Sequence, residues 1–285
     1  MLVLVTGLDG FTGRYVQSEL EAHGHVVVGL ACDLTDSEAL VAEIIRVRAE
    51  AVVHLAAVAF VGHGDASAFY DVNLIGTRNL LDALAQHAPN VKSILLASSA
   101  NIYGNRSEGL ISEATFPDPA NDYAVSKYAM ELMASLWVNR LPIFIVRPFN
   151  YTGRGQDENF LIPKIAAHFR ERKSTIELGN LEIWREFGDV RVVADIYRRL
   201  IECQPVGGTF NVCSGRSHSL KDVILMCEKI TGHTIKLQVN PSFVRDNEVK
   251  VLAGDNARLK EVIGSWQEHT LDETLSWMLG GQVIR

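Results

Sequence analysis

The chain of 285 residues lacks the long apolar runs that mark membrane-spanning and secreted proteins. No window approaches about 18 consecutive apolar residues, the length that a transmembrane helix needs. The first apolar run, residues 1–5, is too short for the hydrophobic part of a signal peptide and has no basic segment before it. We therefore expect a cytoplasmic protein with no membrane partner.

Basic residues are too few for a protein that binds nucleic acid by bulk electrostatics. Lys and Arg number 27 against 34 Asp and Glu, a formal net charge of −7. Apolar residues make up 47% and charged residues 21%, which is typical of a globular protein with one large core and room for a smaller lobe. We expect no nucleic-acid partner, although local basic residues could hold a phosphorylated ligand.

Cysteine is scarce, with four residues in the whole chain. No two of them form a Cys-x-x-Cys pair and no histidine cluster lies beside them, so neither a metal site nor a disulfide framework is indicated. We predict no metal site and interpret the thiols as reduced and structural: Cys32, Cys203, Cys213 and Cys227.

Short apolar runs alternate with amphipathic segments through the first half of the chain. The segments predict helices from after Gly13 to about residue 23, at about residues 69–87 and 123–137, and one that begins at the capping box Thr35-Asp36-Ser37-Glu38. The alternation predicts an α/β fold, a Rossmann-type doubly wound parallel sheet whose ligand binds at the carboxyl ends of the strands. The predicted strands are residues 2–5, 26–28, 51–57, 93–97 and 143–146.

Three glycines, Gly7, Gly10 and Gly13, follow the first predicted strand. Between a strand and a helix this spacing is typical of a dinucleotide-binding loop, because glycines let the backbone approach a pyrophosphate and the helix N-terminus stabilises its charge. The alternative is a tight turn without a ligand. We favour the cofactor and expect Phe11 and Thr12, in the same loop, to contact it.

The end of the second predicted strand decides between NAD and NADP. An acid there would bond the ribose 2′-hydroxyl, but the position is Ala31, and Arg14 is near enough to pair with a 2′-phosphate. Arg14 could equally be a solvated surface residue. The competing interpretation takes Asp33, 20 residues after Gly13, as the ribose acid. We favour NADP(H), with NAD(H) possible, and expect Asp33-Leu34 to face the adenine.

The pattern becomes irregular after Arg147-Pro148. Ser219-Leu220-Lys221-Asp222 is typical of a helix start, and the sequence from Gly254 to the end has helical character. We predict that residues 1–150 form the NAD(P)-binding domain, to which residues 186–212 return. Residues 151–285 then form mainly a smaller C-terminal substrate-binding lobe, interwoven with the first.

Tyr123 and Lys127 are four residues apart on a predicted helix, so they share one face. A free phenol, with a pKa of about 10, is a poor acid at neutral pH. A fixed ammonium favours the phenolate and should lower that pKa. Ser99 ends a strand 24 residues before Tyr123, where its hydroxyl could donate to a carbonyl oxygen beside the phenol. Its alternative is a bond to its own backbone.

Three further polar residues are candidates for substrate binding. Asn150 follows Arg147-Pro148-Phe149 at a strand end and could bond a sugar or a phosphate, or could be a turn residue. Arg185 and Arg245 lie in the irregular half, where each could bind an anionic ligand or be a surface charge.

Together these motifs resemble the extended short-chain dehydrogenase/reductase family over nearly the whole chain. The resemblance implies that Ser99, Tyr123 and Lys127 are the catalytic trio and that Arg185 and Arg245 face the diphosphate of a nucleotide sugar. The motifs that carry it are Thr6-Gly7-x-x-Gly10-x-x-Gly13, His54-Leu55-Ala56-Ala57, Asp71-Val72-Asn73-x-x-Gly76-Thr77, Ser98-Ser99-x-x-Ile102-Tyr103-Gly104, Tyr123-x-x-x-Lys127, Arg147-Pro148-Phe149-Asn150, Arg185-Glu186-Phe187-x-Asp189-Val190 and Asn211-Val212-Cys213-Ser214-Gly215. By the same resemblance, further cofactor contacts come from Leu55, Ala56, Ala57 and Asn73.

Within the family the chain is most similar to reductases of the 4-keto group of GDP-4-keto-6-deoxymannose. This implies an NAD(P)H-dependent reductase of a nucleotide-activated 4-keto-6-deoxyhexose, in deoxysugar biosynthesis for cell-surface polysaccharide. Two departures are Arg154, where a proline is commonly seen, and a very short stretch before Asp33, which omits a strand and its loop.

Three rival functions are weighed against the reductase. A 4,6-dehydratase would need an Asp-Glu pair directly after Ser99, but Ala100 and Asn101 stand there and neither is an acid or a base. A nucleotide-sugar 4-epimerase of the same family would retain tightly bound NAD. A non-catalytic NADP-binding sensor would be expected to lose Tyr123 or Lys127, and both are present.

The predicted helix that carries Tyr123 has more apolar residues than one packed face requires. One stripe is Ala124, Tyr128, Leu132 and Leu136, and the other is Val125, Ala129, Met133 and Trp137. The segment 70–84 has a similar surplus, so two such helices from each of two subunits predict a homodimer through a four-helix bundle, as the resemblance also implies. The alternative is that the second lobe covers the surplus.

Overall fold

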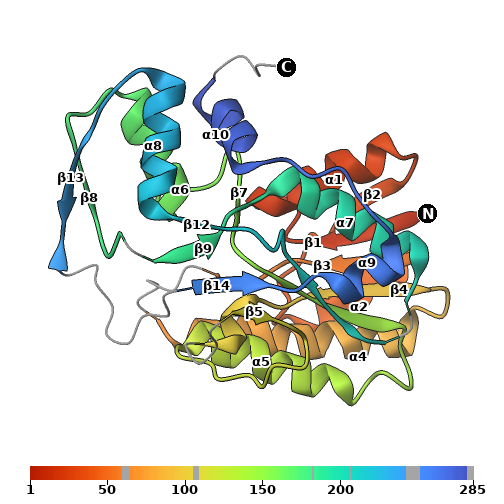
Figure 1. The fold of residues 1–285 in the computed structure, drawn as a ribbon. Coiled ribbons are helices and arrows are strands. Elements are labelled where there is room, and N and C mark those ends of the chain that lie inside the picture. The colour runs from red at the N-terminus through yellow and green to blue at the C-terminus, as the bar shows by residue number, and fades with distance from the viewer. Residues whose placement is uncertain (60–64, 105–108, 182, 206, 242–250, 281–285) are drawn as a thin grey trace.

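The computed structural model describes residues 1–59, 65–104, 109–181, 183–205, 207–241 and 251–280. The chain folds around one central sheet with helices on both faces, and a smaller helical lobe stands beside it (Figure 1). This confirms the predicted α/β fold of the Rossmann type.

Six strands form the central sheet, and each neighbouring pair is parallel. Their order, β11-β6-β4-β3-β1-β2, places β1 next to the edge strand β2. The five strands predicted from apolar runs all occur. The bounds are β1 Leu2–Thr6, β2 Val26–Gly29, β3 Ala51–His54, β4 Ser93–Ala97, β6 Ile143–Pro148 and β11 Thr209–Val212.

Alternating side chains of the strands enter two separate cores. Leu4, Val52 and Ile94 pack against α2, α4 and α5, whereas Val3 and Val53 pack against α1 and α7 on the other face. Burial on both faces explains why these strands read as continuous apolar runs. The helices are α1 Phe11–Ala22, α2 Ser37–Val47, α4 Thr77–His87, α5 Asp122–Ser135 and α7 Val190–Cys203.

The smaller lobe has a core of its own, built by α6 (Leu161–Arg170), α8 (Leu220–Thr231) and α10 (Leu271–Leu279) with the paired strands β8 (Thr175–Leu178) and β13 (Lys236–Val239). A small four-stranded sheet, β12-β9-β14-β5, completes the structure. Its strands are Ser217–Ser219, Trp184–Glu186, Val251–Gly254 and Leu110–Ile111. The remaining short elements are α3 Ser67–Tyr70, the π-helix η1 Asp71–Gly76, the 3-10 helix η2 Ala100–Tyr103, β7 Tyr151–Thr152, β10 Gly188–Asp189 and α9 Ala257–Ile263.

Two helix starts test the capping predictions. Ser219 caps α8 and exchanges hydrogen bonds with Asp222, so that capping box is confirmed. The box predicted at residues 35–38 is wrong, because Asp36 caps α2 by accepting from the Ala39 N–H. Thr35 instead donates its N–H and its hydroxyl to Asp33, in a turn before the helix. A short polar side chain one residue later therefore took the capping role.

The second half is more regular than its sequence suggests. Helices α6 and α7 were not recognised, although α7 is strongly amphipathic and packs against α1 and β4. Gly254 is the last residue of β14, and the helices α9 and α10 follow it. The helical character predicted from Gly254 onward is therefore confirmed only in part. Strand β11 belongs to the central sheet and α7 packs on one of its faces, so the second half of the chain contributes to both lobes. The domain boundaries themselves stay a prediction.

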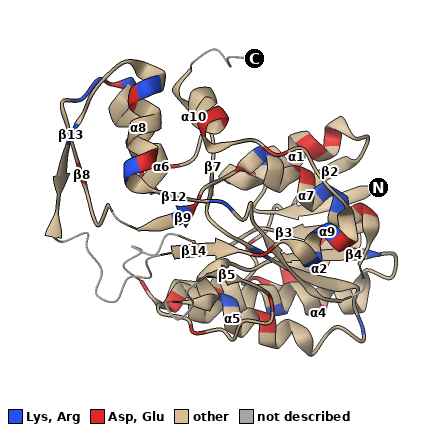
Figure 2. Ribbon diagram, viewed as in Figure 1, with Lys and Arg blue, Asp and Glu red and all other residues tan. Residues whose placement is uncertain are grey.

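The connection after β2 is as short as the sequence indicated. Residues 30–36 lead directly into α2 without a strand, which leaves β2 at the edge of the sheet. The usual order for such sheets places two strands on this side of the first strand. Among the described residues, no helix is long and apolar enough to span a membrane. The positions of acidic and basic residues are interspersed along the ribbon of both lobes in Figure 2.

Candidate functional site

In the glycine-rich loop the backbone packs closely against other backbone segments. Gly7 has a φ of +71°, and a Cβ there would lie 2.9 Å from the Ala56 nitrogen. A Cβ on Gly13 would lie 2.3 Å from the Gly7 carbonyl oxygen, so only glycine lets α1 approach the loop this closely. The N-terminus of α1 therefore lies directly against the glycine-rich loop, an arrangement that suits a pyrophosphate.

Residues after β3, which were expected to contact the cofactor, lie beside the glycine-rich loop. Thr6 accepts hydrogen bonds from the Leu55 and Ala56 N–H groups at 3.2 and 3.1 Å, and this fixes both residues beside Gly7. Ala57 follows and is only partly exposed. The structure thus brings Leu55, Ala56 and Gly7 together at the carboxyl ends of β1 and β3.

Two side chains in the first turn of α1, Phe11 and Thr12, contact Tyr151. Phe11 stacks on Tyr151 with ring centroids 6.2 Å apart, and the Thr12 hydroxyl lies 2.7 Å from the Tyr151 hydroxyl. Arg14 is exposed. Tyr151, which no sequence motif indicated, joins the first turn of α1 to the strand end that carries Asn150.

The residues predicted to face the adenine differ in their surroundings. Asp33 is exposed and accepts both Thr35 bonds at 2.8 Å, and these bonds lower the pKa of its carboxyl. The Leu34 side chain is buried in the core, where it lies against Gly76. Ala31, at the end of β2, is exposed and carries no charge.

The three predicted catalytic side chains come from adjoining elements. Ser99 follows β4, and Tyr123 and Lys127 lie on α5, whose N-terminus is capped by Asn121. Ser99 accepts from the Asn101 N–H at 3.2 Å and caps η2, which is the alternative raised from the sequence, and it lies close enough to the Tyr123 phenol to oppose the rise in its pKa. All three are buried, with exposed fractions of 8%, 9% and 3% for Ser99, Tyr123 and Lys127. The structure therefore assembles the trio at the carboxyl end of β4.

The expected lowering of the phenol pKa does not occur in this structure. Burial raises the pKa of Tyr123 to about 12, and the nearby Ser99 hydroxyl opposes that rise only in part. Lys127 donates to the Ala97 carbonyl oxygen at 2.8 Å rather than to the phenol. Burial also lowers the pKa of Lys127 to about 8, against the opposing charge of Glu131. Desolvation outweighs the pair interaction because both groups are enclosed.

A buried ion pair connects helix α5 to strand β6. Glu131, one turn after Lys127, binds Arg147 at 2.6 Å, and Arg147 also donates to the Tyr103 hydroxyl at 2.9 Å. Tyr103 in turn donates to Asn211 on β11 at 2.7 Å. Arg147 was expected at a strand end, but its partner was not predicted. The spacing Tyr-x-x-x-Lys-x-x-x-Glu places Glu131 on the helix face of Lys127, without indicating the distant Arg147.

Asn73 is buried and holds two segments of the site together. Its side chain accepts from the Val58 N–H at 2.9 Å and donates to the Val58 carbonyl and to the Ser126 hydroxyl. Both amide hydrogens are therefore already used within the protein. Its predicted cofactor contact stays a prediction, and the observed bonds show that it positions α5 against the segment after β3.

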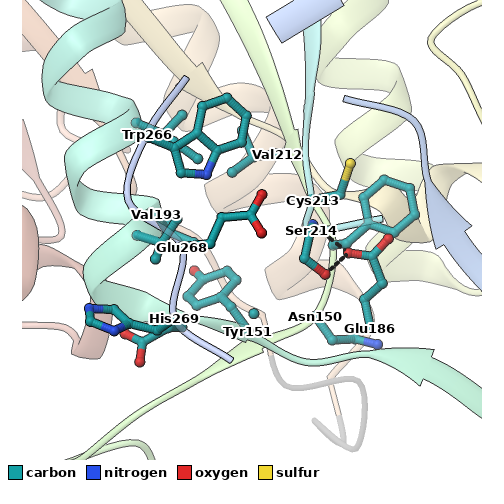
Figure 3. Close-up of a pocket in the computed structure, with 15 residues that line it drawn as sticks. Asn150, Tyr151, Glu186, Val193, Val212, Cys213, Ser214, Trp266, Glu268 and His269 are labelled. Carbon is teal, nitrogen blue, oxygen red and sulfur yellow. Dashed lines mark hydrogen bonds between the residues drawn. The ribbon is translucent and has the colours of Figure 1, made fainter. Parts of the chain in front are cut away.

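A pocket opens beside the strand end of β6, lined by Asn150, Tyr151 and Glu186 together with Trp266, Glu268 and His269 (Figure 3). Glu186 is buried, and its carboxylate accepts from the N–H and hydroxyl of Ser214 and from the N–H of Gly254. The carboxylate thus joins β9, the segment after β11 and β14. Asn150 is exposed at the pocket rim.

The two predicted arginines cannot both be placed. Arg185 is half-buried on β9, donates to the Trp184 carbonyl at 2.9 Å, and is not among the residues that line the pocket, whereas its neighbour Glu186 is. Adjacent residues of a strand point to opposite faces, which accounts for this difference. Arg245 lies outside the described residues. In the described ranges, no cluster of His, Cys, Asp and Glu is arranged to hold a metal ion.

Two characterised relatives align over nearly the whole chain. GDP-6-deoxy-D-talose 4-dehydrogenase of Aggregatibacter actinomycetemcomitans is 36% identical over 93% of this chain and 92% of its own length. GDP-6-deoxy-D-mannose reductase of Pseudomonas aeruginosa is 31% identical over 97% of this chain and 95% of its own length.

Solved structures share the whole architecture. A protein of Burkholderia cenocepacia J2315, described as a candidate epimerase, is 47% identical with a TM-score of 0.94, over 98% of this chain and 97% of its own. RMD from Pseudomonas aeruginosa, solved with NADPH, is 30% identical with a TM-score of 0.89, over 98% and 96%. UDP-glucose 4-epimerase of Thermus thermophilus, solved with NAD, is 26% identical with a TM-score of 0.85, over 98% of each chain.

The family assignment rests on the glycine-rich loop, the buried serine–tyrosine–lysine trio and these likenesses together. Residues 3–213 match the NAD dependent epimerase/dehydratase family. The chain therefore belongs to that family, the nucleotide-sugar branch of the extended short-chain dehydrogenases/reductases, whose related members are NAD(P)-dependent enzymes acting on CH-OH/C=O groups.

Proposed function

We propose that the protein is an NADPH-dependent reductase of the 4-keto group of a GDP-linked 4-keto-6-deoxyhexose. The observation that carries this proposal is that Ser99, Tyr123 and Lys127 lie buried together at the carboxyl end of β4, near a glycine-rich loop that suits a dinucleotide. Ala100 and Asn101, which follow Ser99, provide no acid or base for a dehydration.

The residues of the site divide the chemistry between them. The loop from Gly7 to Gly13 would hold the pyrophosphate of the cofactor, which supplies a hydride for the carbonyl carbon when it is bound. Ser99 donates a hydrogen bond to the keto oxygen, and Tyr123 transfers its phenolic proton to that oxygen as negative charge develops there. The Lys127 ammonium stabilises the phenolate that remains until solvent returns a proton.

The raised pKa of Tyr123 favours reduction of a keto group over oxidation of a hydroxyl. A phenol with a pKa of about 12 carries its proton at neutral pH, which a proton donor requires. Oxidation of a sugar hydroxyl would require the phenolate instead. The enclosed site thus favours the donor form before any substrate binds.

The identity of the nucleotide sugar is proposed from the two characterised relatives. Both are named for GDP-linked 6-deoxyhexoses, and one is named as a 4-dehydrogenase. Reduction at C4 of a shared 4-keto sugar yields either of two C4 epimers, so the relatives suggest the substrate without choosing the product.

A cytosolic location stays a prediction.

NADPH is proposed over NADH on the residues near the expected 2′-position. Ala31 offers no carboxylate there, and Arg14 is exposed in the first turn of α1. RMD supports this choice because it was solved with NADPH, whereas the Thermus epimerase was solved with NAD. Asp33, which is exposed and has a lowered pKa, is the residue that would reverse the preference.

A decisive assay incubates the protein with GDP- and dTDP-linked 4-keto-6-deoxy sugars and NADPH or NADH. We expect stoichiometric oxidation of NADPH with a GDP-linked substrate and formation of one C4 configuration, identified by proton NMR of the product. No oxidation of either cofactor with any of these sugars would contradict the proposal.

The second candidate is a 4-epimerase, favoured by relatives such as UDP-glucose 4-epimerase of Halalkalibacterium halodurans, 27% identical over 94% of this chain. An epimerase retains NAD through both half-reactions, so protein purified without added cofactor would carry about one NAD per chain. Conversion of a 4-hydroxy sugar nucleotide without added NAD(P)H would favour it over the reductase.

We also propose a homodimer formed through α5. Val125, Leu132 and Leu136 are 38%, 55% and 78% exposed on this helix, so the second lobe does not cover them. Their spacing forms an apolar stripe along one side. The segment 70–84 contributes less than expected, because Leu80, Leu81 and Leu84 are buried in the core, while Ile75 is 45% exposed. The two α5 helices would therefore dominate a four-helix interface.

A further inference from the structure

His54 joins two parts of the site inside the protein. It ends β3 with an exposed fraction of 1%, and each of its ring nitrogens has one partner. Nδ1 lies 2.7 Å from the Thr6 hydroxyl, and Nε2 lies 2.8 Å from the Thr77 hydroxyl. Thr6 precedes the glycine-rich loop and Thr77 begins α4, so one side chain spans both elements.

The partners of the two threonines determine which nitrogen carries the proton. The Thr77 hydroxyl donates to the Asn73 carbonyl at 2.7 Å, so it can only accept from His54, and Nε2 must be protonated. The Thr6 hydroxyl already accepts from the Leu55 and Ala56 N–H groups, so its own hydrogen points to Nδ1. Every donor then faces an acceptor, which is possible only for the neutral Nε2–H form.

The same chain of hydrogen bonds continues to the catalytic helix. Asn73, whose carbonyl receives the Thr77 hydrogen, donates from its side chain to the Ser126 hydroxyl at 3.0 Å. Ser126 donates onward to the carbonyl oxygen of Tyr123 at 2.8 Å. Thr6 and Tyr123 are thus connected through buried groups only, with exposed fractions of 1% or less from Thr6 to Ser126.

We propose that His54 is a positioning residue, which as a neutral imidazole protonated on Nε2 fixes the register between the dinucleotide loop and the helix that carries Tyr123. It acts through Thr6 on one side and through Thr77 and Asn73 on the other, and it touches neither cofactor nor substrate. The kinetic part of this proposal rests on the proposed reductase function, whereas the tautomer does not.

The surroundings of His54 keep it neutral. Burial and the nearby charge of Lys127 both lower its pKa, to about 3. A charged imidazole would carry a second N–H toward Thr6, whose oxygen already accepts two N–H bonds. The hydrogen-bond pattern and the burial therefore require the same form.

The tautomer is tested on the folded wild-type protein by long-range proton–nitrogen NMR of labelled histidine, with the His54 signals assigned by comparison with His54→Asn. We expect one protonated and one unprotonated ring nitrogen, the protonated one being Nε2, unchanged between pH 6 and pH 8. A proton on Nδ1, or a titration within this range, would overturn the proposal.

The positioning role is tested with two pairs of variants. Thr77→Val keeps the shape of the side chain and removes the hydroxyl, whereas Thr77→Ser retains it; Thr6→Val and Thr6→Ser form the matching pair. We expect Thr77→Val to lose about tenfold or more in kcat, because misplaced reacting groups cost rate even when binding persists. Thr6→Val should raise the Kd for NADPH, and both serine variants should stay within about twofold of wild type.

A loss of stability alone would not produce this result. Ile176→Val, in the separate core of the smaller lobe, provides a variant destabilised without contact to the hydrogen-bond chain. If Thr77→Val and Ile176→Val reduce kcat equally at equal loss of thermal stability, or if Thr77→Ser fails to restore kcat, the positioning role is wrong. If the wild type reduces no keto sugar, the proposed function fails, and the NADPH affinity of the Thr6 pair still decides the role of His54.

Discussion

The carboxylate of Glu131 binds the guanidinium of Arg147 at 2.6 Å. Glu131 lies on α5, one turn after Lys127. Both side chains of the ion pair are nearly enclosed, with exposed fractions of 6% and 7%. A buried charge without a partner is strongly unfavourable, so this pair is a structural requirement of the site as well as a source of negative charge near Lys127.

Replacing Glu131 should alter both the pH profile and the stability. The Glu131 charge raises the pKa of Lys127 against the effect of burial, so Glu131→Gln should lower that pKa further below about 8. Lys127 would then lose its proton at lower pH, and the alkaline limb of kcat/KM should move to lower pH. Arg147 is left buried and unpaired, which should cost about 3–5 kcal/mol in the free energy of unfolding.

An exposed ion pair provides the control for Glu131→Gln. Glu158 and Arg170 lie on the surface of the smaller lobe with their side chains 60% and 48% exposed. Glu158→Gln should change neither the pH profile nor, by more than about 1 kcal/mol, the unfolding free energy. An alkaline limb in Glu131→Gln at the wild-type pH would show that Glu131 does not influence Lys127.

The wild-type pH profile follows from the two shifted groups. Tyr123, with a pKa of about 12, stays protonated throughout the accessible range and should contribute no limb. Lys127, with a pKa of about 8, is charged below that pH and neutral above it. For the free enzyme, kcat/KM for reduction should therefore fall as pH rises through about 8. A profile flat to pH 10 would contradict the assignment of this limb to Lys127.

Tyr123→Phe removes the proposed proton donor and little else. The ring stays packed, so the protein should fold and bind NADPH while kcat falls by about 10²–10⁴, the range that general acid catalysis supplies. Tyr128→Phe removes a hydroxyl from the same helix and should retain the wild-type rate. More than about a tenth of the wild-type rate in Tyr123→Phe, with normal cofactor affinity, would exclude the phenol as the donor.

Cofactor choice can be tested from both sides of the expected 2′-position. Ala31→Asp places a carboxylate at the end of β2, where it should repel a 2′-phosphate and lower the NADPH-to-NADH ratio of kcat/KM at least several-fold. Arg14→Gln should weaken NADPH and leave NADH almost unchanged. Both residues are exposed, so neither change should affect folding. Equal ratios in both variants and wild type would place the 2′-position elsewhere, with Asp33 as the next candidate.

The sequence predicts the parts of this protein that rely on local patterns. The strands buried on both faces, the Gly7–Gly13 loop and the face shared by Tyr123 and Lys127 all follow from periodicity, spacing and backbone geometry. The structure confirms each of these. Helix α7 is not indicated by its surroundings, because short strands precede it and its buried face packs against α1, which lies far away in the sequence.

Tertiary contacts account for what the sequence could not provide. The lowered pKa expected for Tyr123 assumed a solvated pair, whereas desolvation dominates in the folded site. Glu131 and Arg147 are 16 residues apart, and His54 and Thr6 are 48 apart, so neither contact has a local indication. The capping role of Asp36 over Thr35 was decided by the turn that Asp33 forms with Thr35.

The proposed dimer gives the last prediction. Wild-type protein at micromolar concentration should sediment with about twice the 31.5 kDa mass of one chain. Leu132→Asp combined with Leu136→Asp places charges in the middle of the exposed stripe of α5 and should yield monomers, because each carboxylate would be desolvated at the interface. The fold should survive, since both side chains are exposed in the single chain. Leu225→Asp, at a residue of α8 that is 53% exposed, is the matched control and should remain dimeric. A wild-type mass near that of one chain, or a double variant that still dimerises, would show that this stripe does not form the interface.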